Sequence, residues 1–295
     1  MRLKTLISLP AALVLTSCIS SVNLVEEKIV FNPVIGNEVR SSDMSVPFPE
    51  DKTFGVWALD SRTSAKHMDD CEIVYAGGEW TSDPSTFWPV SQSLSFAAYS
   101  PYSLPMALEG GNLVLNDFDV MKDEADILFT MPVSGITSAQ GAVKLPFMHA
   151  LSKLDMRVAN GFGDDVDLRI DAIVIKGVAR SGDFSTARKS YWRVDESSLE
   201  DIVIFDSVRD GEFFAGPRMQ FIGDVHTIIP QGMHPVVEVS YSFRVDDGEW
   251  IDGQKESVEL QDTYWEAGRY YTYSLIINEV RLKYTTGIGH WSERE

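Results

Sequence analysis

Apolar and polar residues alternate with a period of two along most of this chain. The alternation is strict at 153–158 and 237–245, and it recurs at 271–277. This period predicts half-buried β-strands, because successive side chains of a strand point to opposite faces. The same pattern predicts strands at 28–34, 54–59, 94–99, 127–130, 143–151, 166–178, 221–229 and 256–260. Only residues 197–205 suggest a short helix.

Clusters of turn-forming residues separate the predicted strands. They include Ala76-Gly77-Gly78, Glu109-Gly110-Gly111, Gly161-Phe162-Gly163 and Asp247-Gly248. Many short strands with turns between them predict an all-β fold of antiparallel β-sandwiches. About a dozen strands exceed what one small sandwich holds, so two tandem domains are predicted. The polar stretch at 180–190 is the best linker candidate, and we expect domains at 18–183 and 184–295.

The composition narrows the class of protein. The 295 residues include 44 Asp and Glu against 25 Lys and Arg, which gives a net charge of −19. Binding to nucleic-acid phosphates requires clustered basic residues, so we expect no nucleic-acid partner. The hydrophobic content of 44% is too high for a disordered chain. No later run of about 18 apolar residues predicts a membrane span, and two cysteines cannot build a disulfide-stapled scaffold.

The N-terminus has the pattern of an export signal. Arg2 and Lys4 precede an apolar stretch at 6–15 that ends in small residues. The segment Leu15-Thr16-Ser17-Cys18 resembles a bacterial lipobox, in which the signal peptide is cut off before a lipid-modified cysteine. We therefore expect a lipoprotein signal peptide at 1–17 and lipidation, with palmitate, at Cys18. The alternative is a plain signal peptide with a chance cysteine.

No residue pattern predicts catalysis or a metal site. The five histidines form no spaced pair of the metal-binding type, and His226 and His234 lack a further ligand by spacing. His149 lies in an apolar strand, so we expect it to be packed and hydrogen-bonded. The acidic pairs at 69–70, 164–165 and 246–247 are expected to be turn carboxylates, rather than calcium ligands or a glycosidase pair. We expect no enzyme activity, no cofactor and no metal.

Two of the seven tryptophans are candidates for contact with a ligand. Exposed aromatic rings on a β-sandwich can stack on sugars. Trp80 and Trp250 each follow Gly-Glu in a turn-rich stretch, so we expect them to be exposed. Trp57 and Trp88 lie in strand-like contexts and are expected in the core.

Several short motifs follow one another in a characteristic order. They are Phe54-Gly55-Val56-Trp57-Ala58, Phe87-Trp88-Pro89, 94–101, Asp126-Ile127-Leu128, 147–154, Ile228-Ile229-Pro230-Gln231, 265–273 and a tail ending in Trp291. In order and spacing the chain resembles the fimbrillin family, the subunits of type V pili of the Bacteroidales. The resemblance implies two transthyretin-like β-sandwich domains and export as a lipoprotein to the outer membrane and cell surface. It also implies that an arginine-specific protease removes the first strand, after which a neighbouring subunit donates a strand to the groove.

The residues around position 40 fit such a processing step. Residues 28–34 alternate as an edge strand would, and the stretch 36–43 is small and polar, as a protease site requires. Arg40 is the single Arg or Lys between Lys28 and Lys52, so a cut between Arg40 and Ser41 would release the first strand together with Cys18. A new strand would then satisfy the exposed sheet edge. The alternative is that Arg40 is an ordinary loop residue.

We expect the donor strand within residues 280–291. The apolar positions with even spacing are Val280, Leu282, Tyr284 and Ile288. One face of this strand could therefore fill a groove, and its glycines at 287 and 289 would allow it to bend. The competing prediction is that the segment closes its own domain, with Trp291 as a core plug.

Together these features predict a structural or adhesive subunit of a surface pilus. Its expected partners are other pilus subunits joined by β-strand addition, an arginine-specific surface protease, and the outer membrane. The alternatives are a non-polymerising fimbrial anchor or tip protein and a monomeric glycan-binding surface lipoprotein. A glycosidase is the least favoured prediction.

Overall fold

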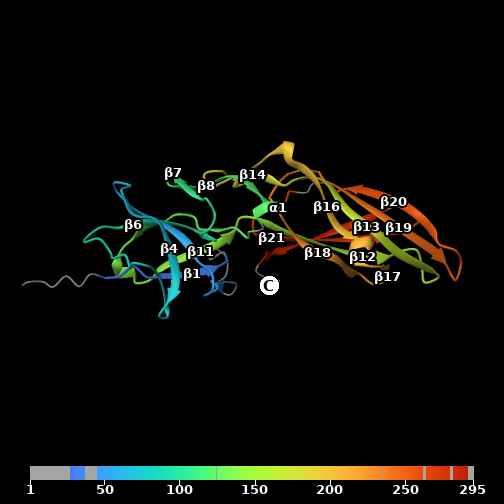
Figure 1. The fold of residues 1–295 in the computed structure, drawn as a ribbon, viewed down its shortest axis with the longest axis horizontal. Coiled ribbons are helices and arrows are strands. Elements are labelled where there is room, and N and C mark those ends of the chain that lie inside the picture. Colours follow the sequence, from blue (N-terminus) through green and yellow to red (C-terminus); the bar gives the residue numbers. More distant parts are fainter. Residues whose placement is uncertain are drawn as a thin grey trace, which may run out of the picture.

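The computed structural model describes residues 27–36, 45–123, 125–232, 234–261, 264–279 and 282–291. Its regular elements are nearly all strands, which confirms the all-β fold. The molecule is elongated, with the first strands of the chain (blue and cyan) at one end and the later strands (orange) at the other (Figure 1). Within the described ranges, no helix is both long enough and apolar enough to span a membrane.

A nine-stranded sheet forms the core of the first region. Its strands are β1 (Phe31–Ile35), β2 (Val46–Pro47), β3 (Phe54–Asp60), β4 (Lys66–Ala76), β5 (Glu79–Ser82), β6 (Leu94–Ser100), β9 (Leu128–Phe129), β10 (Val133–Ile136) and β11 (Val143–His149). The order is β10-β6-β3-β4-β5-β1-β11-β9, and β2 pairs with β1. β6 also pairs with β9, through Tyr99 with Phe129 and Ser100 with Leu128. The sheet therefore closes on itself, and we call the circuit β6-β3-β4-β5-β1-β11-β9 the ring.

A four-stranded sheet packs against the ring. Its strands, in the order β15-β14-β8-β7, are β7 (Ala107–Glu109), β8 (Asn112–Asp119), β14 (Ser181–Ser185) and β15 (Trp192–Val194). Leu115 and Phe184 from this sheet share a buried cluster with Trp57 and Tyr99 from the ring. A separate cluster, which includes Phe54, fills the ring. The first region therefore has two cores, one on each side of β3.

The second region is a sandwich of two four-stranded layers, one of which carries an extra short strand. One layer has the order β18-β12-β21-β22 and the other β16-β13-β19-β20, with β17 paired to β13. The strands are β12 (Ser152–Asn160), β13 (Val166–Ala179), β16 (Leu199–Asp206), β17 (Phe213–Ala215), β18 (Gln220–Ile228), β19 (Val236–Val245), β20 (Ile251–Glu259), β21 (Arg269–Ile277) and β22 (Lys283–His290). The apolar positions predicted from alternation, such as Leu154, Met156 and Val158, are fully buried between the layers. The remaining described elements are single turns: α1 (Val120–Asp123), α2 (Ser207–Asp210) and two 3₁₀ turns, Ser138–Gln140 and Glu196–Ser198.

Three details differ from the sequence-based expectations. The expected boundary between residues 183 and 184 falls inside β14, which pairs with β8 of the first region. β12 and β13 pair only with strands of the second region, so the chain crosses into that region near residue 151 and returns to the first region with β14 and β15. The helix suggested at 197–205 is wrong, since β16 occupies most of that range. The sheets are also not purely antiparallel, because β1 runs parallel to β11 and β12 parallel to β21.

Candidate functional site

β1 lies inside the ring, between β5 and β11. It runs parallel to β11 from the pair Phe31–Val143 to the pair Ile35–Phe147, and Phe31 also pairs with Trp80 of β5. The expectation of an edge strand is therefore wrong. Alternation reports which faces of a strand are buried, and it carries no information about the number of neighbours in the sheet.

The inward side chains of β1 and of the residues just before it belong to the core of the ring. They are Ile29, Phe31, Pro33 and Ile35. The Phe31 ring contacts Phe54 and Phe96 edge-on, with centroids 6.1 and 5.9 Å apart. Removal of β1 would therefore leave an apolar slot lined by aromatic rings, flanked by the unpaired backbone of β11 on one side and of β5 and β2 on the other. We call this space the β1 slot.

The backbone hydrogen bonds of β1 extend beyond its regular residues. The amide of Ile29 donates to the Thr86 carbonyl at 2.8 Å, and the amide of Val143 donates to the Val30 carbonyl at 2.8 Å. At the other end, the Gly36 amide donates to the Phe147 carbonyl at 2.9 Å. If the strand left, the Thr86 and Phe147 carbonyls and the Val143 amide would each need a new partner.

β22 is an edge strand, hydrogen-bonded only to β21. Its eight paired residues follow β21 without a register shift, from Lys283–Ile276 to His290–Arg269. Its burial is low, and Ile288 is 63% exposed. Leu282, just before the strand, and Trp291, just after it, are buried. In this structure the tail pairs with its own sandwich, as the competing prediction had it, but Trp291 belongs to the buried cluster of the first region and does not plug the core of its own domain.

Trp291 is buried where the two regions meet. Its ring stacks on His149 of β11, and the Lys153 Nζ lies 4.4 Å from the ring centroid. The His149 Nδ1 is 3.0 Å from an Asp126 carboxylate oxygen, and the imidazole is buried. This confirms that His149 is packed and hydrogen-bonded. No sequence pattern joins His149 to Trp291, because they are far apart along the chain: His149 ends β11, and Trp291 follows β22 of a different sheet.

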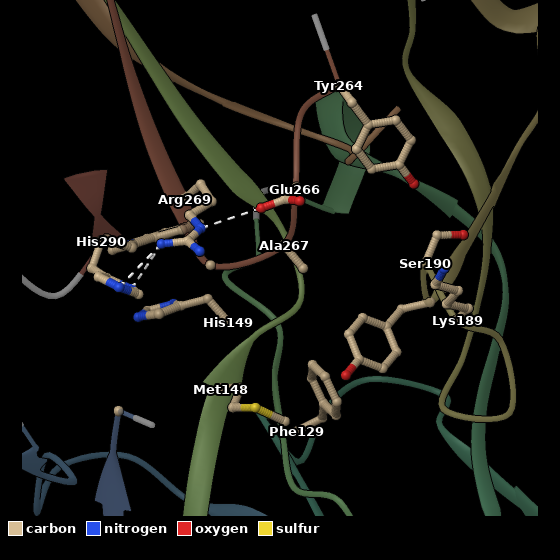
Figure 2. A pocket seen from close by; sticks show the side chains of 14 residues that line it. Phe129, Met148, His149, Lys189, Ser190, Tyr264, Glu266, Ala267, Arg269 and His290 are labelled. Atoms are coloured by element: carbon tan, nitrogen blue, oxygen red, sulfur yellow. Dashed lines mark hydrogen bonds and ion pairs between the residues drawn. The ribbon is translucent and has the colours of Figure 1, made fainter. Parts of the chain in front are cut away.

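A pocket of about 590 Å³ opens beside this stack (Figure 2). Its walls come from both regions, including Phe129, Met148, Tyr264 and Arg269. The Arg269 guanidinium points to Glu266 and to the His290 ring, whose Nε2 is 3.1 Å away. Tyr271 fixes the loop at the rim, because its hydroxyl accepts from the Glu266 amide and donates to the Tyr264 carbonyl. Burial raises the pKa of Tyr271, which keeps this hydroxyl protonated.

The two candidate ligand-contact tryptophans differ in their environments. Trp80 is 8% exposed and packs between Phe48 and Phe54, so the expectation that it is exposed is wrong. Trp250 is half-buried, and the guanidinium carbons of Arg169 and Arg244 each lie 5.0 Å from its ring centroid. The arginines already cover ring surface that a sugar would need. Trp57, predicted in the core, is 3% exposed.

The remaining predicted sites have mixed outcomes. Cys18, Arg40 and Ser41 lie outside the described residues, as does Val280. Across the part of the chain that the structure describes, no group of three or more His, Cys, Asp or Glu side chains could hold a metal ion.

The pair Asp69-Asp70 was expected in a turn, but it lies in β4 beside a register shift, where Asp70 accepts from the Tyr99 hydroxyl at 3.0 Å. Burial raises the pKa of Asp70.

Comparison with known proteins places the chain in a family. Residues 40–291 match the fimbrillin-like family model. A fimbrial protein from Bacteroides vulgatus aligns over 90% of this chain and 100% of its own, with a TM-score of 0.61 and 12% identity. Proteins assigned to cell adhesion from Bacteroides uniformis and Bacteroides ovatus align over 90% of this chain and 99% and 98% of their own. Their TM-scores are both 0.57, with 16% and 14% identity. No curated protein sequence matches significantly. With these neighbours sharing its fold and the family model spanning most of its length, the chain belongs to the fimbrillin-like family.

Proposed function

We propose that this protein is a structural or adhesive pilus subunit that is joined to other subunits by β-strand addition. It is exported as a lipoprotein through Cys18, and an arginine-specific surface protease cuts it between Arg40 and Ser41. The observation that carries the proposal is the position of β1 inside a closed sheet, directly before the segment that contains Arg40. Family membership supports a non-catalytic pilus or adhesion subunit at the cell surface.

The cut would turn β1 into a separable strand. After cleavage, β1 and Cys18 would be attached to the rest of the molecule only by non-covalent contacts. Loss of β1 would expose the β1 slot and the facing backbones of β11, β5 and β2, and an added strand would satisfy them. The family match starts at Arg40, so β1 lies outside the part that matches the family model, which supports its being the removable piece.

β22 has the properties of a donor. It holds to its sandwich by hydrogen bonds on one side only, and most of its side chains are exposed. Its C-terminal end lies at the junction of the two regions, whereas its start lies beside Ile276 near the other end of β21, about 24 Å away. A released tail would therefore extend from the far end of the second region. That geometry joins the tail of one molecule to the first region of the next, in a head-to-tail line.

The test compares the protein on the cell surface in three forms. Wild type and Lys52→Ala, which changes the next basic residue, should both begin at Ser41 and form detergent-stable polymers. Arg40→Ala should keep its lipid and remain monomeric. Detergent-stable polymers from Arg40→Ala would overturn the proposal. A wild-type protein that retains Cys18 and never polymerises would favour the anchor or monomeric alternatives.

A further inference from the structure

The pocket beside the stack of His149 and Trp291 has the size and the position of a ligand site. Its volume of about 590 Å³ lies within the range of small-molecule sites, which often lie where two domains meet. Its walls come from parts of the chain that are distant in sequence: β11, the loop between β14 and β15, the loop before β21, and the end of the tail. Strand addition, as proposed above, gives this pocket no role.

The charged side chains of the pocket reverse the balance of the whole chain. Lys189 and Arg269 line it together with a single carboxylate, Glu266, whereas the chain has 44 acidic against 25 basic residues. Arg269 and Lys189 lie on opposite sides of the pocket (Figure 2). The pocket therefore offers a negatively charged group a local excess of positive charge within a strongly acidic protein.

Arg269 has donors that its protein partners do not use. Its Nε donates to a Glu266 carboxylate oxygen at 3.4 Å, and its Nη1 lies 3.1 Å from the Nε2 atom of His290. Within the described ranges, its Nη2 makes no hydrogen bond or ion pair. A guanidinium binds a carboxylate through its N–H donors, so Arg269, held in place by His290, can bind the carboxylate of a ligand.

Glu266 and Tyr264 narrow the class of anion. The Glu266 side chain is 60% exposed, and its carboxylate can only accept hydrogen bonds. A sulfate ion brings no hydroxyl donor to this carboxylate, whereas a sugar brings several. The Tyr264 ring also lines the pocket and is 47% exposed, so it offers a flat apolar face to a sugar ring. An anionic group, hydroxyl donors and an apolar face occur together in an acidic sugar.

We infer that this pocket binds an acidic sugar residue, a uronic or a sialic acid. Arg269 binds the carboxylate, Lys189 adds positive charge from the opposite wall, Glu266 accepts from a sugar hydroxyl, and Tyr264 packs against the sugar ring. The site is distinct from Trp80 and Trp250, the tryptophans that the sequence suggested for ligand contact. It is complete within one molecule, so the inference does not depend on strand addition.

Matched sugars test whether the carboxylate is recognised. All measurements use the full chain with Arg40→Ala, so that Gly36 stays in the pocket wall whether or not strand addition takes place. Saturation-transfer NMR compares glucuronic acid with glucose, and N-acetylneuraminic acid with its methyl ester. At least one acid should bind about tenfold more tightly than its uncharged counterpart, as expected for a hydrogen-bonded charged group. Equal affinities within both pairs, or no binding of either acid, would overturn the inference and leave the proposed function untouched.

Charge substitutions test where the acid binds. Arg269→Gln should weaken its binding about tenfold, and Arg269→Lys should retain part of the affinity. Lys189 is exposed, so Lys189→Gln should leave the fold intact and weaken binding about threefold. Arg244→Gln is the matched control, because the Arg244 and Arg269 side chains are both 34% exposed and Arg244 lies outside the pocket. If Lys189→Gln and Arg269→Gln bind the acid as tightly as Arg244→Gln does, the acid binds elsewhere and the inference is wrong.

A further pair of variants tests the contact with the sugar ring. Tyr264→Ala should weaken binding of the acid about fivefold, because it removes the exposed ring from the pocket wall. Phe221→Ala removes a ring of similar exposure, 54%, from β18 outside the pocket and should bind like the parent chain. Thermal unfolding of each variant checks that its fold is intact. Equal affinities in folded Tyr264→Ala and Phe221→Ala chains would contradict the inferred site.

Discussion

The His149 imidazole and the Trp291 indole stack with centroids 4.1 Å apart and planes 7° apart. His149 ends β11, the strand that pairs with β1 along five residues, and Trp291 ends the tail that contains β22. One strand therefore contacts both β1, which we propose is removed, and the end of the predicted donor. The stack holds the C-terminal end of β22 at the junction while its other end turns back into β21.

We expect Trp291→Ala to loosen β22. Loss of a buried indole costs about 3–5 kcal/mol of stability in a core, and apart from its pairing with β21 the strand is mostly exposed. Hydrogen exchange of the β22 amides should become at least tenfold faster, while the β13 amides in the core of the second region keep their protection. Trp250→Ala, which removes a half-buried tryptophan away from the junction, should leave β22 exchange unchanged. Unchanged exchange in Trp291→Ala would show that pairing with β21 alone holds the tail.

Trp57→Ala should destabilise the first region. The indole is 3% exposed, stacks on Tyr99 at 5.3 Å and donates to Asp69 at 3.2 Å. Removing a large buried ring leaves a cavity, and the expected loss is about 3–5 kcal/mol. The change in the free energy of unfolding is measured by urea denaturation monitored by circular dichroism. Val90→Ala changes a residue that is 67% exposed and should shift the free energy of unfolding by no more than about 0.5 kcal/mol.

Gly223→Ala should separate β18 from β16. Gly223 has a φ of 70°, and an added Cβ would collide with the Ile204 carbonyl of β16. The loss of stability from backbone strain and collision together should exceed the roughly 1 kcal/mol that a positive φ alone costs an alanine. Gly253→Ala is the matched control, because its φ is 73° and nothing lies near the added Cβ. Thermal unfolding should show a clearly larger loss of stability for Gly223→Ala than for Gly253→Ala. Equal losses of stability would mean that β16 moves away from the added Cβ at no cost.

Stability should fall as the pH drops through the usual range of histidine. Burial lowers the pKa of His226, an effect that the nearby Arg209 reinforces and Asp224 opposes. The unfolded chain then binds a proton near pH 6.5 while the folded chain still resists it, so acidification favours unfolding. The urea midpoint of wild type should be lower at pH 5.5 than at pH 7.5. His226→Gln should show a smaller decrease, and an identical decrease in both would assign the pH effect to other groups.

Cys18→Ala should abolish lipidation. Among the residues at the end of the signal, only Cys18 carries a thiol, and Cys71 lies inside the first region. Labelled palmitate should enter wild type and a Cys71→Ser control, but not Cys18→Ala. Incorporation into Cys18→Ala would contradict the lipobox prediction.

Local pattern predicted the strands of this fold better than it predicted their neighbours. The alternation at 153–158 identified the buried face of β12 correctly, because a strand with one buried face has an apolar residue at every second position. It could not show that β1 has partners on both sides, since pairing depends on residues such as Val143 that lie far along the chain. The same limit applies to the boundary expected between residues 183 and 184, because β14 pairs with β8 of the first region after β13 has entered the second.

The candidate site shows the same division. The turn at Gly77-Gly78 was predicted, and both glycines have positive φ angles. Trp80 directly follows that turn, and whether it faces water or the core depends on the side from which β5 leaves the hairpin. That direction is set by packing against Phe48 and Phe54, which the local sequence does not reveal.

The closed ring sets a one-to-one ratio between empty slots and donated tails in the proposed assembly. In the proposed assembly, a molecule that had lost β1 would lack one strand and would regain closure from another molecule, so each slot would take up one tail. A copy that escaped the protease would keep its ring complete and could give a tail but could not receive one. Such a copy would end the chain on its own side and, by retaining Cys18, would bind that end to the membrane. The choice between growth and attachment would then lie in a single peptide bond.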